Sequence, residues 1–483
     1  MKPKTLAVLA ILVAGLAAFI AFYERDLPGS DEQRELGKRV FPKLAADDIT
    51  GLQVEWNGKR VKLEREPAPA EVAGASAAAA PAERDWRIVA PLTARADKTM
   101  ADRLAGDLAQ LESERSLEGA KPADVGLATP RGKVTWTTGK AQGTLELGDE
   151  VPASSDIVVA SAGAKEPRVV AKSIVADIDH QPGDWRSKQV LAEGRDKIDR
   201  IRIVPAGGAE ETVLARKGER FEVERPYADA ADPQEVDPLL SELTGLQVDH
   251  FLDAPLPPAA EKALAAPVGR IELSLAGKTA PFVVEVGPET EPGGDRYLRA
   301  DSQTFEAKTR LADTVSRPPV DWRSKAWTSF DSWKVERIRV DDPSGKLDLT
   351  RSEGDWLRDG VKISYTDVGD LLYAITSARA DEVLTGNDAA AHPASSPVLT
   401  VVFSDAQGGE ETLTLGKPDG DHTPARVSGR DVVLMLPNKA ADDVLAKVKA
   451  VRESKPVEPP KSETTTTGKG QEKKSSSGTP QPR

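Results

Sequence analysis

Trp86-Arg87-Ile88-Val89-Ala90-Pro91, with Asp97 eleven residues after its tryptophan, opens a pattern that the chain repeats. The same aromatic residue and aspartate, at the same spacing, stand at three places: Trp86 and Asp97, Phe221 and Asp232, and Trp356 and Asp367. Each step is 135 residues, which is the length of a domain and exceeds the roughly 20–50 residues of solenoid repeats. The chain is therefore predicted to hold three related domains in tandem.

A four-residue motif stands at the end of the first two copies. Asp184-Trp185-Arg186-Ser187 reappears as Asp321-Trp322-Arg323-Ser324, and no such motif follows the third copy. A motif present at both junctions, and missing where no junction remains, indicates that the tryptophans fill the joints and the arginines pair with acidic neighbours. The alternative is that a tryptophan beside an arginine stacks on a sugar or holds a partner. The candidate partner or inter-repeat contacts are Trp185, Arg186, Trp322 and Arg323.

Within each copy the pattern predicts antiparallel strands packed with one capped amphipathic helix, an α+β fold. Asn57-Gly58 between two alternating apolar runs is a hairpin signal. Asp232-Pro233-Gln234-Glu235 has the order of an N-cap followed by a first turn, and apolar residues follow at helical spacing. We read Asp97 and Asp367 as N-caps too, so the three recurring carboxylates need no catalytic role. A glycine ends the second later strand of each copy and predicts a positive-φ turn: Gly148, Gly287 and Gly416.

The amino-terminal segment is predicted to be a membrane anchor. Residues 6–22 carry no charge, and seventeen residues at about 1.5 Å each reach about 25 Å, the short end of a bilayer span. Lysines before the span and mixed charges after it place the amino terminus in the cytoplasm. The expected protein is therefore single-pass in the inner (cytoplasmic) membrane, with the bulk of the chain periplasmic. A signal peptide cleaved after Ala17-Ala18 is the alternative, disfavoured by the length of the apolar run.

The predicted organisation follows from these features. A Pro-, Ser-, Thr- and Lys-rich end, poor in large apolar groups, predicts a disordered tail. The predicted segments are an anchor at 1–26, a juxtamembrane segment at 27–48, repeat domains at 49–191, 192–329 and 330–452, and the tail at 453–483.

The composition argues against several kinds of chemistry. Cysteine is absent, which removes disulfides and thiolate ligands, and a formal charge of −13 disfavours a nucleic-acid partner. The four histidines do not have the spacing of a zinc site: His180, His250, His392 and His422. No phosphate-binding loop or dinucleotide fingerprint is present. We therefore expect no catalytic residue, no metal, no cofactor and no enzymatic activity.

The chain resembles a bacterial family, the domain of unknown function numbered 4340. The resemblance rests on the segment from Phe22 to Pro28, on the repeated units from Trp86 to Leu111 and from Phe221 to Leu246, and on the two Asp-Trp-Arg-Ser motifs. It implies association with auxiliary subunits of gliding-motility-type ABC transporters, and hence an envelope complex. The family offers no catalytic residues to carry over. The third copy departs from the pattern because it lacks the proline of Pro91 and Pro226 and the closing motif.

These observations lead to one expected function and two rivals. The expected function is a non-enzymatic, membrane-anchored periplasmic scaffold or accessory subunit of an ABC-transporter-like complex. The first rival is a cell-wall or polysaccharide-binding module that uses exposed Trp and Arg side chains. The second is an envelope hydrolase, which would need two carboxylates about 5–10 Å apart in a cleft, and no such pair is indicated.

Overall fold

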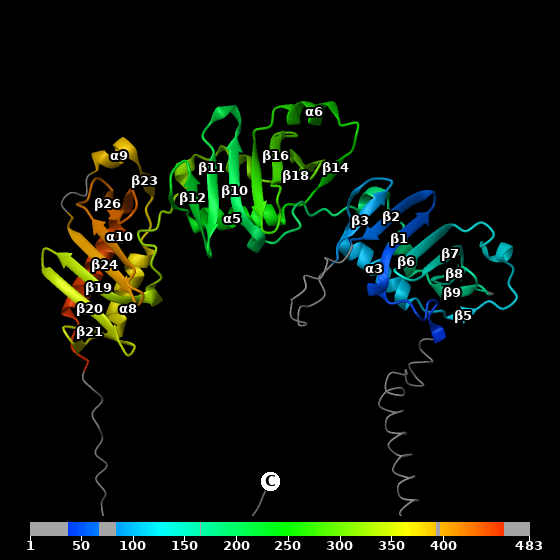
Figure 1. Ribbon diagram of the computed structural model, residues 1–483, viewed down its shortest axis with the longest axis horizontal. Helices are drawn as coiled ribbons and strands as arrows, with labels where there is room; N and C mark the ends of the chain where they lie inside the picture. The colour runs from blue at the N-terminus through cyan, green and yellow to red at the C-terminus, as the bar shows by residue number, and fades with distance from the viewer. Residues whose placement is uncertain (1–36, 67–83, 165, 393–396, 458–483) are drawn as a thin grey trace, which may run out of the picture. The chain divides into compact units, whose positions relative to one another are not determined.

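The computed structural model describes residues 37–66, 84–164, 166–392 and 397–457. The chain divides into two compact units, Met1–Val190 and Leu191–Arg483. The first unit contains one nine-stranded sheet and the second contains two (Figure 1). Neighbouring strands in all three sheets are antiparallel where their pairing is described.

The three sheets have the same strand order. The first is β4-β3-β2-β1-β6-β7-β8-β9-β5, and the other two repeat this order with later numbers. Two meanders therefore meet at the central pair, β1 with β6, and one short strand closes the far edge. The strands of the first sheet are β1 (Ile49–Trp56), β2 (Lys59–Arg65), β3 (Trp86–Ala90), β4 (Ala94–Arg95), β5 (Arg115–Ser116), β6 (Gly132–Thr138), β7 (Gln142–Glu150), β8 (Asp156–Ser161) and β9 (Arg168–Ala171).

The second and third sheets follow the same plan. The strands of the second are β10 (Ile198–Pro205), β11 (Thr212–Lys217), β12 (Arg220–Arg225), β13 (Asp229–Ala230), β14 (His250–Leu252), β15 (Gly269–Leu275), β16 (Phe282–Glu289), β17 (Arg296–Ala300) and β18 (Gln303–Ala307). Those of the third are β19 (Val335–Asp342), β20 (Gly345–Ser352), β21 (Asp355–Arg358), β22 (Val361–Lys362), β23 (Glu382–Leu384), β24 (Leu399–Asp405), β25 (Glu410–Leu415), β26 (His422–Val427) and β27 (Val433–Pro437).

Helices are few in the described chain. The α-helices are α3 (Lys98–Gln110), α4 (Ser173–Ile178), α5 (Pro233–Gly245), α6 (Pro258–Ala265), α7 (Leu311–Ser316), α8 (Tyr365–Ser377), α9 (Gly386–Ala391) and α10 (Asn438–Glu453). The 3-10 turns are η2 (Ala46–Asp48), η3 (Pro122–Val125), η4 (Pro182–Trp185), η5 (Arg195–Lys197), η6 (Ala206–Gly208), η7 (Pro319–Trp322) and η8 (Ser332–Lys334).

The α+β class predicted from the sequence is wrong, because the described chain is mostly β. Each repeat has nine strands, whereas its equivalent long helix, α3, α5 or α8, has 13 residues. The long helices give the clearest signal in the sequence, because their apolar residues recur at helical spacing over three turns. Edge strands such as β4 and β5 have only two residues each and leave no alternation to recognise. The sequence therefore underestimated the extent of each sheet.

The core of each repeat lies where its long helix packs on alternate side chains of the central strands. In the first repeat Leu104 and Leu108 of α3 are buried together with Leu52, Leu63 and Val134 of the sheet. The predicted Asn57-Gly58 hairpin is confirmed, because both residues have positive φ, 48° and 78°, between β1 and β2. In the third repeat α10 packs against α8 (Figure 1).

Two of the three predicted helix caps are confirmed and the third is corrected. Asp97 accepts a hydrogen bond from Met100 N–H and caps α3, and Asp232 accepts from Gln234 N–H and caps α5. In α8 the N-cap is Ser364, and Asp367 lies in the first turn as a donor of its N–H to Ser364 Oγ.

The N-cap of α8 stands earlier than the repeat spacing predicts, because the loop before α8 is shorter than the equivalent loop before α3. Ser364 follows Trp356 by eight residues, whereas Asp97 follows Trp86 by eleven. The first two repeats have a cis proline in this loop, Pro91 and Pro226. The third has a tight turn at Asp359-Gly360, with φ of 50° and 79°, between β21 and β22. Aligning the aspartates by equal spacing therefore places the third cap one turn too far along the chain.

The glycines expected in turns have another role. Gly148 and Gly287 lie inside β7 and β16, Gly416 directly follows β25, and none of the three has the predicted positive φ. An added Cβ at Gly148 would stand 2.3 Å from the carbonyl oxygen of Val125, and one at Gly287 would stand 2.7 Å from that of Tyr297. These positions therefore need glycine because another backbone segment passes close by.

The predicted membrane location is corrected. In residues 37–66, 84–164, 166–392 and 397–457, no helix is both long enough and apolar enough to cross a membrane. The predicted span at residues 6–22 lies outside these residues, as does most of the predicted tail. Of the predicted juxtamembrane segment, residues 37–48 are described and belong to the first repeat: Val40 and Leu44 are buried in its core. The helices of the described residues therefore conflict with the predicted single-pass inner-membrane location.

Candidate functional site

The tryptophans of the repeated motif are buried. Trp185 has no exposed surface and belongs to the core of the first repeat, while Trp322 is 1% exposed. The carbonyl of Trp185 accepts the N–H of Asp97 at 2.7 Å, and the carbonyl of Trp322 accepts the N–H of Asp232 at 2.9 Å. Each motif therefore brings the chain back to the helix cap of its own repeat.

The two arginines of the motif lie in different surroundings. Arg186 is half-buried, and its Nε donates to the carbonyl of Gly183 at 3.3 Å. Arg323 is 4% exposed, its Nε donates to the carboxylate of Asp229, and its guanidinium lies 4.2 Å from the ring centroid of Tyr227. The structure thus brings Arg323, but not Arg186, into a buried ionic cluster within the second unit.

This cluster joins the second repeat to the third. Arg430, in the turn before β27, donates from Nε to Asp229 Oδ1 at 2.7 Å and from Nη2 to Oδ2 at 3.1 Å. Its Nη2 also donates to the carbonyl of Ser324 at 2.7 Å, and its Nη1 to that of Ala326 at 3.3 Å. One guanidinium of the third repeat therefore holds both a carboxylate of the second repeat and the segment that connects the two. We call Asp229, Asp232, Arg323, Arg379 and Arg430 the ionic junction.

Asp232 has two functions in the junction. Its Oδ1 accepts from Gln234 N–H at 3.0 Å and caps α5. Its Oδ2 accepts from Lys325 N–H at 3.1 Å and from Arg379 Nη2, in the third repeat, at 2.7 Å. The side chain is fully buried, so both oxygens are satisfied by the protein itself. Asp232 is thus a helix cap that also holds the next repeat.

The electrostatics of the junction favour the charged form of Asp229. Burial by itself would raise the pKa of this carboxyl, since its side chain is 1% exposed. The hydrogen bonds and positive charges of Arg430 and Arg323 outweigh burial and leave the pKa below its ordinary value. Asp229 is therefore an ionised group between two arginines at neutral pH.

Sequence reasoning missed Asp229, Arg379 and Arg430. The position of Asp229 in the first copy is Ala94, so the carboxylate does not recur and the repeat gives no sign of it. Arg379 and Arg430 stand outside any repeated motif, after α8 and in a turn. Their role depends on the pairing of two repeats in space, which a single chain without homologues does not reveal.

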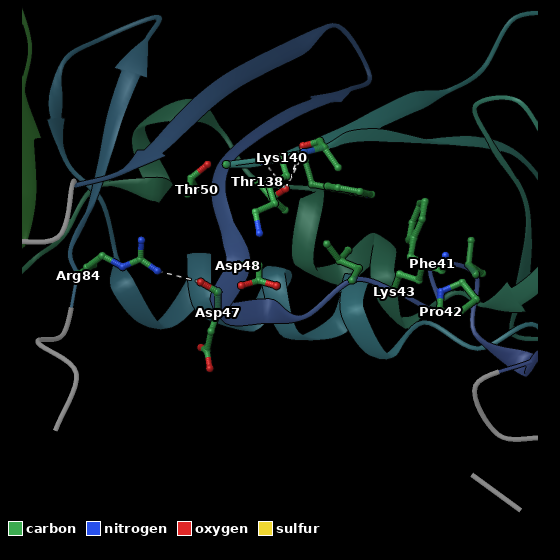
Figure 2. A pocket seen from close by; sticks show the side chains of 14 residues that line it. Phe41, Pro42, Lys43, Asp47, Asp48, Thr50, Arg84, Thr138 and Lys140 are labelled. Carbon is green, nitrogen blue, oxygen red and sulfur yellow. Dashed lines mark hydrogen bonds between the residues drawn. The ribbon is translucent and has the colours of Figure 1, made fainter. Parts of the chain in front are cut away.

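A pocket of about 720 Å³ lies in the first repeat. Phe41 stands at one end and Arg84 at the other, with Asp47 and Asp48 between them and Thr50, Thr138 and Lys140 opposite (Figure 2). Phe41 meets Trp136 edge-on, with ring centroids 5.5 Å apart. Arg84 donates to the carbonyl of Asp47 at 2.9 Å. An apolar end and a charged end suit an amphipathic group, and the volume is that of small-molecule sites in general.

Within the part of the chain that the structure describes, the histidines and acidic groups do not gather into a metal site. His392 Nδ1 lies 2.8 Å from Asp419, and His422 Nε2 lies 3.0 Å from Asp381, so each has one carboxylate partner. No group of three or more His, Asp or Glu side chains suited to a metal ion occurs among the residues that the structure describes.

Comparison with known proteins gives one family. The family model described as "Domain of unknown function (DUF4340)" matches residues 86–267 and, a second time, residues 222–397. Each match starts in β3 or β12, contains one Asp-Trp-Arg-Ser motif, and ends just before β15 or β24 of the next repeat. The matched unit therefore covers parts of two consecutive structural repeats and the connection between them. No curated protein matches the chain.

Proposed function

We propose that this chain, which belongs to the DUF4340 family, is a non-enzymatic scaffold or accessory subunit of a transporter-like complex. The observation that supports this function best is the ionic junction between the second and third repeats. A scaffold has to keep its binding surfaces at a constant spacing and orientation. Bidentate arginine–carboxylate bonds are directional, and burial protects them from water and salt.

The ionic junction suits a scaffold because none of its charged residues can be replaced alone without loss of a buried ion pair. Asp229 binds Arg323 of its own repeat and Arg430 of the next, and Asp232 binds Arg379 while it caps α5. Loss of one partner would leave a buried charge uncompensated, which is far more costly than loss of a surface pair. The second and third repeats then act as one body that presents surfaces of both.

The transporter as the partner comes from the family resemblance and not from a contact seen in the molecule. The glycan-binding alternative needs an exposed indole face, because stacking on a sugar uses the face of the ring. Trp185 and Trp322 are both buried, and the guanidinium of Arg317 lies 4.8 Å from the ring centroid of Trp322. The motif therefore offers no stacking surface, and we do not pursue that alternative.

Capture of the full chain from its native cells tests the proposal. A tagged wild-type chain, an Asp229→Asn variant and an Asp348→Asn control are captured under mild conditions, and the proteins bound to each are quantified by mass spectrometry. Asp348 pairs with Arg337 at the surface, so its substitution removes a carboxylate without touching the junction. We expect an ABC-transporter ATPase and permease with the wild type and the control, and severalfold less of both with Asp229→Asn.

Two outcomes would contradict the proposal. A wild-type chain captured without any transporter subunit would refute the transporter-like complex. Equal capture by all three chains, with circular dichroism showing that the Asp229→Asn chain is folded, would refute the requirement for the junction.

A further inference from the structure

The pocket of the first repeat lies between the segment of residues 37–48, which leads into β1, and the hairpin of β6 and β7 (Figure 2). In this segment the N–H of Val40 donates to the carbonyl of Leu111, the residue after α3, at 2.8 Å. In the third repeat the N–H of Trp327 donates to the carbonyl of Ala378, the residue after α8, at 3.1 Å. The segments that lead into the first and third repeats are therefore equivalent and can be compared.

A buried carboxylate ties this segment to the hairpin in the third repeat. Glu411 of β25 is 7% exposed and pairs across the hairpin with Phe403. Its carboxylate accepts hydrogen bonds from the hydroxyl of Thr328, from the hydroxyl of Ser329 at 2.7 Å and from the N–H of Ser329 at 3.2 Å. The segment and the hairpin of the third repeat are thus held together by the side chain of one residue.

The first repeat has no carboxylate at this place. Gly143 pairs with Trp136 as Glu411 pairs with Phe403, so glycine replaces the glutamate. A Cβ on Gly143 would stand 2.3 Å from the indole of Trp136, which covers the position. The hairpin therefore offers no side chain to the segment here, and the pocket of about 720 Å³ lies between the two.

The pocket has an apolar floor. Val40, Leu44 and Trp136 line it and are buried, with 6%, 7% and 9% of their surface exposed. Phe41 is half-buried and meets the indole of Trp136 edge-on. An apolar group of a ligand would leave water for contact with these side chains, which favours binding.

The rim of the pocket carries charges of both signs. The charged residues that line it are Lys43, Asp47, Asp48, Arg84 and Lys140. Arg84 donates to the carbonyl of Asp47, and Asp48 faces the side on which Lys140 lies (Figure 2). Within the described ranges, neither Asp48 nor Lys140 has an ion-pair partner. A ligand with a single charge would meet a like charge on one side of the pocket, whereas a zwitterion would meet an opposite charge on each.

We propose that this pocket binds a small zwitterion with an apolar side chain, either a free apolar amino acid or a short apolar peptide. The apolar side chain packs on Phe41 and Trp136, the ammonium group binds Asp48, and the carboxylate binds Lys140. This inference goes beyond the proposed scaffold and does not depend on it. The pocket lies within the first repeat, whereas the ionic junction belongs to the other unit.

Isothermal titration calorimetry of the full chain tests the proposal with five probes. Leucine and leucyl-leucine are zwitterions, N-acetyl-leucyl-leucine keeps only the carboxylate, leucyl-leucine amide keeps only the ammonium group, and dodecanoate is an anionic amphiphile. We expect one site for the zwitterions, and whichever of the two binds more tightly identifies the source of the ligand. The acetylated and amidated dipeptides should bind about tenfold more weakly than leucyl-leucine, because each lacks one charge-assisted hydrogen bond.

Two substitutions assign the charged contacts. Asp48→Asn should weaken leucyl-leucine about tenfold and leave the acetylated dipeptide unchanged, since that probe has no ammonium group. Lys140→Gln should likewise weaken leucyl-leucine and leave the amide unchanged. The matched controls are Asp124→Asn and Lys121→Gln in the exposed turn η3, which does not line the pocket, and they should change no affinity. A variant that had lost its fold would instead bind every probe more weakly.

Three results would overturn the proposal. The first is that the wild-type chain binds neither leucine nor leucyl-leucine at millimolar concentration. The second is that the acetylated dipeptide or dodecanoate binds as tightly as leucyl-leucine, which would make the pocket a site for anions. The third is that Asp48→Asn and Lys140→Gln chains, shown by circular dichroism to be folded, discriminate among the probes as the wild type does.

Discussion

Arg430 of the third repeat binds both oxygens of the Asp229 carboxylate of the second repeat, at 2.7 Å and 3.1 Å. The two side chains are 12% and 1% exposed, so the pair is shielded from water. Arg323 binds the same carboxylate from within the second repeat. A single aspartate thus receives one arginine from each repeat, and its charge is what allows the two guanidinium groups to lie together.

Replacing Asp229 by Asn should destabilise the second unit strongly. The amide keeps the shape but not the charge, and it leaves Arg323 and Arg430 uncompensated in a buried site, at a cost of about 3–5 kcal/mol. Urea unfolding followed by circular dichroism measures the change. Asp348→Asn, which removes an exposed pair, should cost less than about 1 kcal/mol. Equal losses from the two substitutions would contradict the special role of the buried pair.

The stability contributed by Asp229 should disappear in acid. The pKa of this carboxyl is lower in the folded protein than the ordinary value of about 3.9, because Arg430 and Arg323 outweigh burial. The ionised group therefore stabilises the fold above about pH 4, and this contribution is lost as pH falls through the lower folded pKa. The difference in unfolding free energy between the wild type and Asp229→Asn should be constant above about pH 5 and shrink below about pH 4.

Asp177 should have the opposite effect in the first unit. Burial, together with a hydrogen bond and repulsion from Asp107, raises the pKa of Asp177 to about 6, although Arg103 lies 2.8 Å away. A folded pKa above the unfolded value of about 3.9 means that the native state binds more protons between about pH 4 and 6, so stability falls as pH rises through that window. Asp177→Asn should therefore stabilise the first unit by about 1–2 kcal/mol at pH 7 and have little effect near pH 4. A pH-independent effect in thermal unfolding would contradict this assignment.

Repetition made much of the local structure predictable. The hairpin at Asn57-Gly58 and the caps at Asp97 and Asp232 follow from short-range rules, in which a turn residue or a carboxylate satisfies neighbouring backbone groups. The membership in the DUF4340 family also follows from the repeated pattern. These features need only residues close in sequence, and they were found.

Pairings between distant residues were not predictable. The two-residue strands β4 and β5 exist because neighbouring strands supply their hydrogen bonds, so their sequences carry no alternation. The ionic junction joins Asp229 to Arg430, 201 residues away, and neither position recurs in the other copies. The same limit explains the displaced cap of α8, since the shorter turn at Asp359-Gly360 changes the spacing on which the alignment relied.

The N-cap of α8 allows two assignments to be compared by mutation: Asp367, which the sequence spacing predicts, and Ser364, which the structure shows. Ser364→Ala should destabilise the third repeat by about 1 kcal/mol, because Ser364 Oγ accepts the N–H of Asp367. Asp367→Ala should cost less, about 0.3–1 kcal/mol, because that carboxylate does not cap the helix and acts through the helix dipole in the first turn and the nearby charge of Lys447. Asp97→Ala, which removes a true aspartate cap in the first repeat, serves as the reference at about 1 kcal/mol. If denaturant unfolding showed a larger loss of unfolding free energy for Asp367→Ala than for Ser364→Ala, Asp367 and not Ser364 would be the N-cap of α8.

Gly148 should tolerate no side chain, although it lies within a strand and not in a turn. A Cβ there would meet the carbonyl oxygen of Val125 at 2.3 Å, and a backbone atom cannot move aside as a flexible side chain can. Gly148→Ala should therefore cost about 1–3 kcal/mol, the usual range for overpacking. Gly139, in the loop between β6 and β7, has no atom within 4 Å of its Cβ position and no positive φ. Gly139→Ala should be neutral or stabilising by up to about 1 kcal/mol, since it reduces the freedom of the unfolded chain. If both substitutions had the same small effect on urea unfolding, the close approach of residue 125 to β7 would be refuted, and the turn first expected at Gly148 would have to be reconsidered.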